Sequence, residues 1–144
     1  MAAAIKVTIC LDNESITNQA AEWYFQNAYT LTHQVNFLYM KSTKNDNSEE
    51  QENQLKIKIQ NYIEKYNLSD PKIFIIPTES NRKEPLAKEL LNEIEKIGSE
   101  MIVLGCKYNQ KASLGSVSGY VIKNTKAVCL VRKTKSVEDT VRGK

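Results

Sequence analysis

The residues best suited to ligand chemistry are an aspartate near the start of the chain and two glycines in its last third. Asp12 follows residues 5–11, a largely apolar, β-branched run that is typical of a strand. Gly105 follows a second apolar run at residues 101–104, and Gly115 precedes a pattern that is typical of a helix. If the two strands are neighbours in a parallel sheet, all three residues lie at the edge where ligands usually bind.

Each of these groups suits a different part of a polar, anionic ligand. A carboxylate such as Asp12 accepts hydrogen bonds from an exocyclic amine or a sugar hydroxyl. Gly105 has no side chain, so the backbone there can approach a sugar or a phosphate closely. A helix that begins at Ser116 offers free N–H groups and a hydroxyl to an anionic oxygen. In the alternative, Asp12 only caps the first helix and the glycines serve turns; spacing alone favours neither.

The sequence lacks the motifs of common catalytic sites. It contains neither GxxxxGKS/T nor a GxGxxG after the first strand, which argues against P-loop and dinucleotide-binding sites. His33 is the only histidine in the sequence and is expected at the surface. Ser118 therefore has no predicted histidine to act as its base. The sequence also shows no cluster of histidines and cysteines that could bind a metal ion. Cys106 lies beside Lys107, but no base accompanies it. We therefore expect no catalysis beyond, at most, slow hydrolysis of a bound ligand.

Composition indicates one globular domain over residues 1–144. Hydrophobic residues make up 41% and charged residues 26% of the chain, and the net charge of +3 is spread among both signs, which argues against a nucleic-acid partner. Three cysteines without CxxC spacing indicate reduced thiols. Because no signal-like N-terminus and no bilayer-spanning apolar stretch is present, we expect a cytoplasmic protein without a membrane partner.

Alternating strand and helix patterns predict the fold class. Expected strands lie at residues 5–11, 35–40, 72–76, 101–104 and 127–132, and expected helices at residues 16–33, 55–66, 85–97 and 116–124. The first helix is predicted from the near-helical spacing of its apolar positions, Ile16, Ala20, Trp23, Ala28 and Leu31. Residues 41–54 are expected to form a polar surface loop, and residues 134–144 a loose tail. This alternation predicts an α/β fold, a five-stranded parallel sheet with helices on both faces.

Three sequence features carry a family resemblance. They are Cys10-Leu11-Asp12 followed by Ser15, Glu84-Pro85 at a helix start, and MIVLG…LGSVSGYVI…AVCLVR near the end. Over residues 5–133 the chain resembles the universal stress protein family. The resemblance implies a Rossmann-like sheet of strand order 3-2-1-4-5. It also implies an adenine-nucleotide binding protein, holding ATP or AMP with or without Mg²⁺, that acts as a sensor or regulator in a stress response.

The resemblance also implies a set of nucleotide-binding residues: Leu11, Asp12, Met40, Leu104, Gly105, Gly115, Ser116 and Val117. Asp12 would meet the adenine, the apolar members would line the base pocket, and the glycines with Ser116 and Val117 would hold ribose and phosphates. The sequence departs from the family pattern of Gly, two residues, Gly, nine residues, then Gly-Ser. Tyr108 replaces the middle glycine, the loop is three residues shorter, and Arg82 and Lys83 stand where a glycine usually precedes the helix.

Two other functions are compatible with the same sequence. The first is a nucleotide-independent dimerising protein with a vestigial pocket, whose working surface is the last strand or the polar loop at residues 41–54. In either case the family resemblance implies a homodimer that pairs through the last strand, residues 127–131. The second is an adenylate-forming or thiolation enzyme of related architecture. Such enzymes need a Gly- and Ser-rich loop after the first strand, and residues 12–15, Asp-Asn-Glu-Ser, do not match it.

Overall fold

The computed structural model describes residues 4–12, 15–44, 46–79, 83–108 and 116–135. Within them, five strands alternate with four helices: β1 (Ile5–Cys10), α1 (Ser15–Asn27), β2 (His33–Ser42), α2 (Ser48–Lys65), β3 (Lys72–Thr78), α3 (Lys83–Ile97), β4 (Met101–Tyr108), α4 (Ser116–Asn124) and β5 (Val128–Lys135). The predicted alternation is therefore confirmed.

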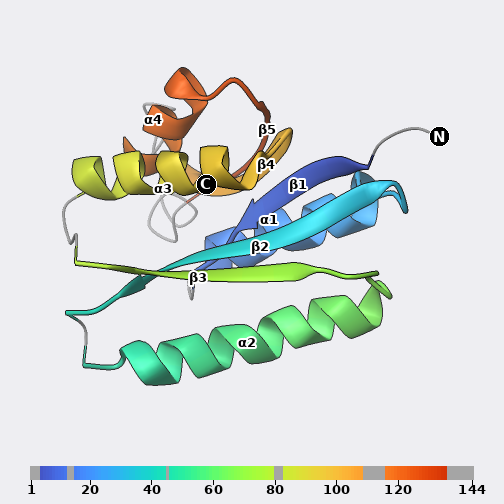
Figure 1. The fold of residues 1–144 in the computed structure, drawn as a ribbon, viewed down its shortest axis with the longest axis horizontal. Coiled ribbons are helices and arrows are strands. Elements are labelled where there is room, and N and C mark those ends of the chain that lie inside the picture. The colour runs from blue at the N-terminus through green and yellow to red at the C-terminus, as the bar shows by residue number, and fades with distance from the viewer. Residues whose placement is uncertain (1–3, 13–14, 45, 80–82, 109–115, 136–144) are drawn as a thin grey trace, which may run out of the picture.

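The strands form one parallel sheet in the order β3-β2-β1-β4-β5 (Figure 1). In the central pairs Val7 lies opposite Val35 on one side and Met101 on the other. The outer pairs are equally parallel, with Asn36 opposite Lys72 and Met101 opposite Val128. The predicted fold class and strand order are confirmed.

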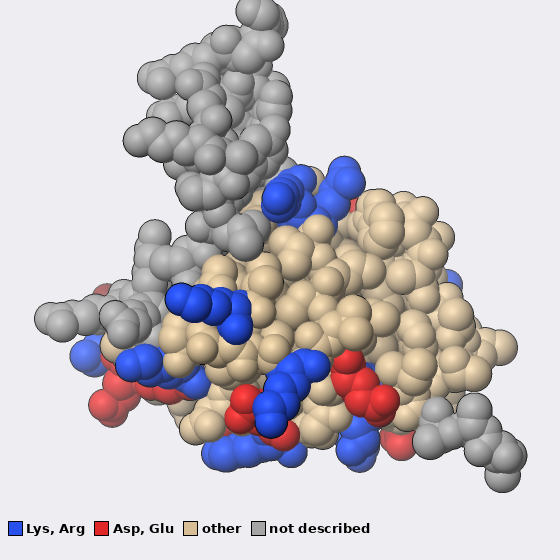
Figure 2. Space-filling model, turned by 90° about the horizontal axis from the view of Figure 1, so that it is seen from above, with Lys and Arg blue, Asp and Glu red and all other residues tan. Residues whose placement is uncertain are grey.

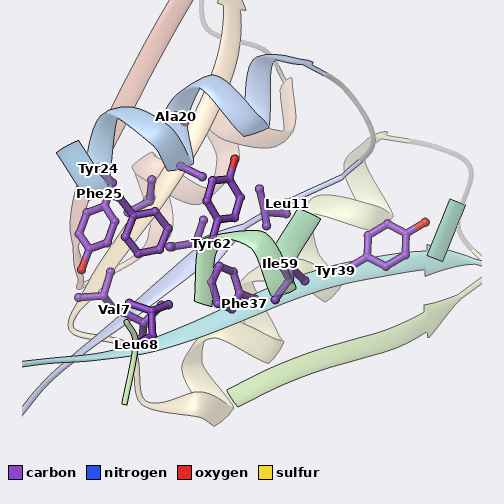
Figure 3. Close-up of a cluster of buried hydrophobic side chains, with 14 of the residues drawn as sticks. Val7, Leu11, Ala20, Tyr24, Phe25, Phe37, Tyr39, Ile59, Tyr62 and Leu68 are labelled. Carbon is purple, nitrogen blue, oxygen red and sulfur yellow. The ribbon is translucent and has the colours of Figure 1, made fainter. Parts of the chain in front are cut away.

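Helices α1 and α2 cover one face of the sheet, and α3 and α4 cover the other. Because side chains alternate along a strand, β2 sends Phe37 and Tyr39 to the first face and Leu38 to the second. Figure 3 shows the first core, in which Tyr24, Phe25 and other side chains of α1 meet Tyr62 of α2 above the sheet.

The second core explains why β4 is apolar at every position of its first half. Leu90 and Ile94 of α3 and Val121 of α4 pack over Ile102 and Leu104. Val103 points to the opposite face and belongs to the first core. All three β4 side chains are almost fully buried, as expected for a strand covered on both sides.

Helix α1 ends earlier than predicted, at Asn27 rather than near His33. The backbone N–H groups of Ala28 and Tyr29 both donate to the carbonyl oxygen of Tyr24, which closes the helix. Of the apolar positions that predicted this helix, Trp23 is 37% exposed, and Leu31 lies beyond the helix and is 89% exposed.

Helix α2 begins at Ser48, so the prediction of a loop over residues 41–54 is wrong in its second half. Glu49 and Glu50 lie in the first turn, where negative charge is favourable. The ammonium of Lys41, at the end of β2, lies 2.7 Å from Glu49 and 3.0 Å from Glu52. Ion pairs rather than apolar packing join the first turns of α2 to the end of β2, so the hydrophobic pattern of the sequence does not reveal these turns.

Strands β3 and β4 continue beyond their predicted ends, to Thr78 and Tyr108. Pro77 was expected to close β3, but it pairs in register with Lys41. A proline is tolerated there because β3 is an edge strand, whose outer side needs no backbone donor.

The surface carries both signs of charge. In the space-filling view of Figure 2, lysine or arginine and acidic side chains lie next to one another along the lower edge of the visible face. This mixture agrees with the small net charge of +3.

Candidate functional site

The site predicted from the sequence lies at the carboxyl ends of the neighbouring strands β1 and β4, whose following helices cover opposite faces of the sheet. Helix α1 leaves β1 toward one face, whereas α4 follows the neighbouring β4 and covers the other. The Leu11 N–H donates to the Leu38 carbonyl oxygen at 3.0 Å, which carries the β1–β2 ladder just past the end of β1. Asp12 and Gly105 consequently lie at the same crevice, a usual ligand position in open α/β sheets.

A cavity of about 210 Å³ occupies this crevice. Its lining comprises Cys10, Leu11, Asp12, Thr17, Leu38, Met40, Leu86, Leu90, Leu104, Gly105, Val117 and Ser118. Six of the eight predicted residues are among them, namely Leu11, Asp12, Met40, Leu104, Gly105 and Val117. Gly115 and the side chain of Ser116 fall outside the described part of the structure, as do Arg82, Lys111 and the side chains of Lys83, Lys107 and Tyr108.

Six lining residues were not predicted. From the sequence, Leu86 and Leu90 belong to the expected helix at residues 85–97, and Leu38 and Cys10 to expected strands. Thr17 and Ser118 come from the first turns of α1 and α4. The helical period, which brings the third residue of each helix near the strand it follows, was the available signal for these two.

The cavity walls are mostly apolar. Leu38 and Met40 come from β2, Leu86 and Leu90 from α3, and Leu104 from β4. The polar side chains on the described lining are those of an aspartate, a threonine, a serine and a cysteine, with no lysine, arginine or histidine among them. This combination suits a flat, apolar ring that carries a hydrogen-bond donor.

The carboxylate of Asp12 is attached to the first turn of α1. Thr17 Oγ1 donates to Asp12 Oδ1 at 2.9 Å and accepts from the Asp12 N–H at 3.1 Å. Both residues are half-buried. The sequence left open whether Asp12 binds a ligand or serves α1; it lines the cavity and also joins α1 to β1.

Gly105 has a packing role that its position in the sequence does not reveal. A Cβ atom there would lie 2.5 Å from the carbonyl oxygen and 2.8 Å from the carbonyl carbon of Ile16. Real side chains do not approach backbone so closely, so the first turn of α1 rests directly on β4. Gly105 therefore lines the cavity and also permits the contact that closes one side of it.

On the other side of the cavity, α4 is linked to the same glycine. Ser118 is 8% exposed, and its hydroxyl lies 3.5 Å from the Gly105 carbonyl oxygen, a long hydrogen bond. Val117, half-buried, borders the cavity beside it. Gly105 thus contacts the helices of both faces.

The thiol in the cavity is kept neutral. Burial raises the pKa of Cys10 to about 12, with smaller contributions from Cys129 and the negative charge of Asp12. Cys10, Cys106 and Cys129 are all free. A neutral thiol is a poor nucleophile, so Cys10 contributes to the apolar wall.

His33 is the first residue of β2, at the amino ends of the strands, and it does not border the cavity at their carboxyl ends. Its exposure is intermediate, so it lies at the surface with part of the ring covered. Its Nδ1 lies 2.6 Å from the hydroxyl of Tyr24, and the two rings stack with centroids 5.8 Å apart. Partial burial lowers the pKa of His33.

Among the described residues, no group of three or more His, Cys, Asp or Glu side chains is placed to hold a metal ion. None of the helices in the same part of the chain combines the length and apolar character needed to cross a bilayer.

At the level of sequence, no protein-family model and no curated protein matches this chain. Solved structures do match. Universal stress protein UspA from Lactobacillus plantarum superposes with a TM-score of 0.68 over 91% of this chain and 99% of that chain, at 12% identity. An Arabidopsis thaliana universal stress protein family protein with AMP bound gives 0.63 over 94% and 95%, at 14% identity.

A third structure is a universal stress protein in complex with cAMP, with a TM-score of 0.66 over 92% of this chain and 98% of that chain, at 12% identity. At such low identities the likeness concerns the fold. The fold that the sequence resemblance implied is therefore confirmed for this chain.

Proposed function

From its universal stress protein fold and the cavity at the carboxyl ends of β1 and β4, we propose that this protein binds an adenine nucleotide, AMP or ATP, and acts as a sensor or regulator in a stress response. The observation that carries the proposal is the convergence of Asp12, Gly105 and Val117 on one apolar cavity. Structural neighbours with AMP and cAMP bound support the same ligand class.

The cavity matches a base better than a whole nucleotide. Its volume of about 210 Å³ lies below the roughly 300–1,000 Å³ typical of pockets that enclose a complete ligand. The adenine ring would lie between Met40, Leu86 and Leu104, with its exocyclic amine donating to Asp12. The ribose and phosphates would extend toward the N-terminus of α4, where Gly115 and Ser116 are proposed to complete the site.

Calorimetric titration with AMP, ATP and cAMP, each with and without Mg²⁺, tests this proposal. We expect binding by the wild-type protein and at least about tenfold weaker binding by Asp12→Asn, because the variant replaces a charged acceptor of the amine. Asp70→Asn is the matched control. Asp70 is exposed and has a left-handed φ of 51° that asparagine tolerates. Its backbone carbonyl oxygen accepts a hydrogen bond from Gln34, which the substitution leaves in place.

Absence of heat with all three nucleotides at high micromolar protein, together with no nucleotide in the mass spectrum of the purified protein, would overturn the proposal. Equal binding by wild type and Asp12→Asn would remove Asp12 from the site.

We further propose a cytoplasmic location, in keeping with the free thiols.

The edge strand β5 favours a second candidate, a protein that works as a homodimer with or without nucleotide. In the described sheet β5 pairs only with β4, so its outer backbone groups face away from the sheet. Val128, at its start, is 64% exposed. An apolar edge of this kind is covered well by a second copy of itself.

A further inference from the structure

The cavity wall contains one hydroxyl whose position gives it a specific task. Thr17 lies in the first turn of α1, borders the cavity, and contacts Asp12 through both the side chain and the backbone of that residue. Its Oγ1 donates to Asp12 Oδ1 at 2.9 Å and accepts from the Asp12 N–H at 3.1 Å. These two bonds restrict the rotation of the Asp12 side chain relative to its own backbone.

Thr17 is itself held in place by its neighbour in α1. The carbonyl group of Ile16 lies so close to Gly105 that no Cβ atom fits between them. Ile16 is also buried, at 7% exposure. The first turn of α1 is therefore fixed against β4, and Thr17 is presented to Asp12 from a rigid support rather than from a loop.

We propose that Thr17 is a positioning residue that orients the Asp12 carboxylate toward the edge of the bound base. This inference rests on the proposed function. A carboxylate with one oxygen bonded to Thr17 has its plane set before the ligand arrives, so less orientational freedom is lost on binding. An oriented carboxylate accepts a hydrogen bond from an amino group and repels a carbonyl oxygen at the same place.

Thr17 consequently sets the selectivity of the site between two classes of base. A 6-aminopurine such as adenine donates to the carboxylate, whereas a 6-oxopurine such as hypoxanthine presents an oxygen there. AMP and IMP carry the same ribose and phosphate, so the ratio of their affinities reports the base edge alone.

The test is calorimetric titration of wild type, Thr17→Val and Thr17→Ser with AMP and with IMP. Valine keeps the shape of threonine and removes the hydroxyl, whereas serine keeps the hydroxyl. We expect the AMP-to-IMP affinity ratio to fall by about tenfold in Thr17→Val, the scale of one hydrogen bond to a charged group. Thr17→Ser is expected to restore most of the ratio. Circular dichroism confirms that each variant is folded.

A double-mutant cycle separates positioning from a direct contact of Thr17 with the ligand. If Thr17 acts through Asp12, Thr17→Val changes the affinity ratio in the wild-type background and leaves it unchanged in an Asp12→Ala background. Equal effects in both backgrounds would overturn the inference.

The possible failures are distinguishable. Wild-type protein that binds no purine nucleotide overturns the proposed function and this inference with it. Wild-type protein that prefers AMP, together with a Thr17→Val variant that keeps the full preference, overturns only the role of Thr17.

Discussion

At the scale of single residues, the candidate site depends on side chains that serve the fold and the cavity together. Asp12 lines the cavity while its carboxylate is bonded to Thr17 in α1. Gly105 lines it while making room for Ile16. Lining the cavity and supporting the local structure are therefore not exclusive roles, because Asp12 and Gly105 each do both.

Gly105→Ala tests the packing role. The new methyl group would overlap the Ile16 carbonyl group, which cannot move without shifting α1. We expect a loss of about 1–3 kcal/mol in the free energy of unfolding, typical of overpacking, measured by urea denaturation. We also expect weaker AMP binding, since α1 carries Thr17.

Gly98→Asn is the control for that prediction. Gly98 has a left-handed φ of 78°, which asparagine tolerates, and the nearest atom to an added Cβ is the flexible Lys6 ammonium at 3.7 Å. We expect a much smaller change in stability. If Gly105→Ala were as stable as wild type, the close contact between α1 and β4 would be disproved.

At the scale of elements, polar contacts fix the boundaries that apolar patterns missed. Lys41 joins the end of β2 to the start of α2 through Glu49 and Glu52. At the other end of β2, His33 joins that strand to α1 through Tyr24, which is fully buried. The two ends of β2 and the start of α2 thus depend on contacts between polar side chains, and such contacts leave no hydrophobic pattern in the sequence.

The contact of His33 with Tyr24 predicts a pH dependence of stability. Burial lowers the pKa of His33 below its usual 6.5 in the folded protein, so between the two values the unfolded chain binds more protons. Stability is therefore expected to fall as the pH drops through about 6.5, and this contribution levels off below the lowered folded-state pKa.

Urea denaturation of wild type and His33→Gln between pH 8 and pH 5 measures this contribution. The variant should show a smaller loss of stability across this window. Identical pH profiles for the two proteins would show that His33 titrates equally in the folded and unfolded chain.

At the scale of the whole molecule, the parallel sheet ends in two edges of different character. Pro77 lies on β3 at one edge, where it removes a backbone donor and discourages pairing. The first half of β5, at the other edge, is apolar, and Val128 is exposed. This asymmetry favours self-association through β5.

Val128→Lys tests the homodimer. We expect wild type to scatter light as a dimer and the variant as a monomer, because a charge on an edge strand opposes pairing. Ile73→Lys is the matched control, since Ile73 is 44% exposed on the opposite edge strand, and it should leave the dimer intact. A wild-type protein that is monomeric at every concentration contradicts the homodimer proposal.

The pattern of residues along the chain was sufficient to predict the fold class. Apolar runs of strand type alternate with helical stripes, and this local pattern is enough to predict a parallel sheet covered on both faces. It also singled out Asp12 and Gly105, because they directly follow strands. The resemblance added the strand order, and Leu11, Met40, Leu104 and Val117 as further predicted site residues.

Only the tertiary structure decided what surrounds these residues. Thr17, Leu86 and Ser118 border the cavity because three helices converge on the ends of β1 and β4. Ion pairs and close backbone contacts, such as those of Glu52 with Lys41 and of Ile16 with Gly105, join segments far apart or without apolar pattern. Their energy depends on distances in space, which hydrophobic periodicity along a chain does not encode.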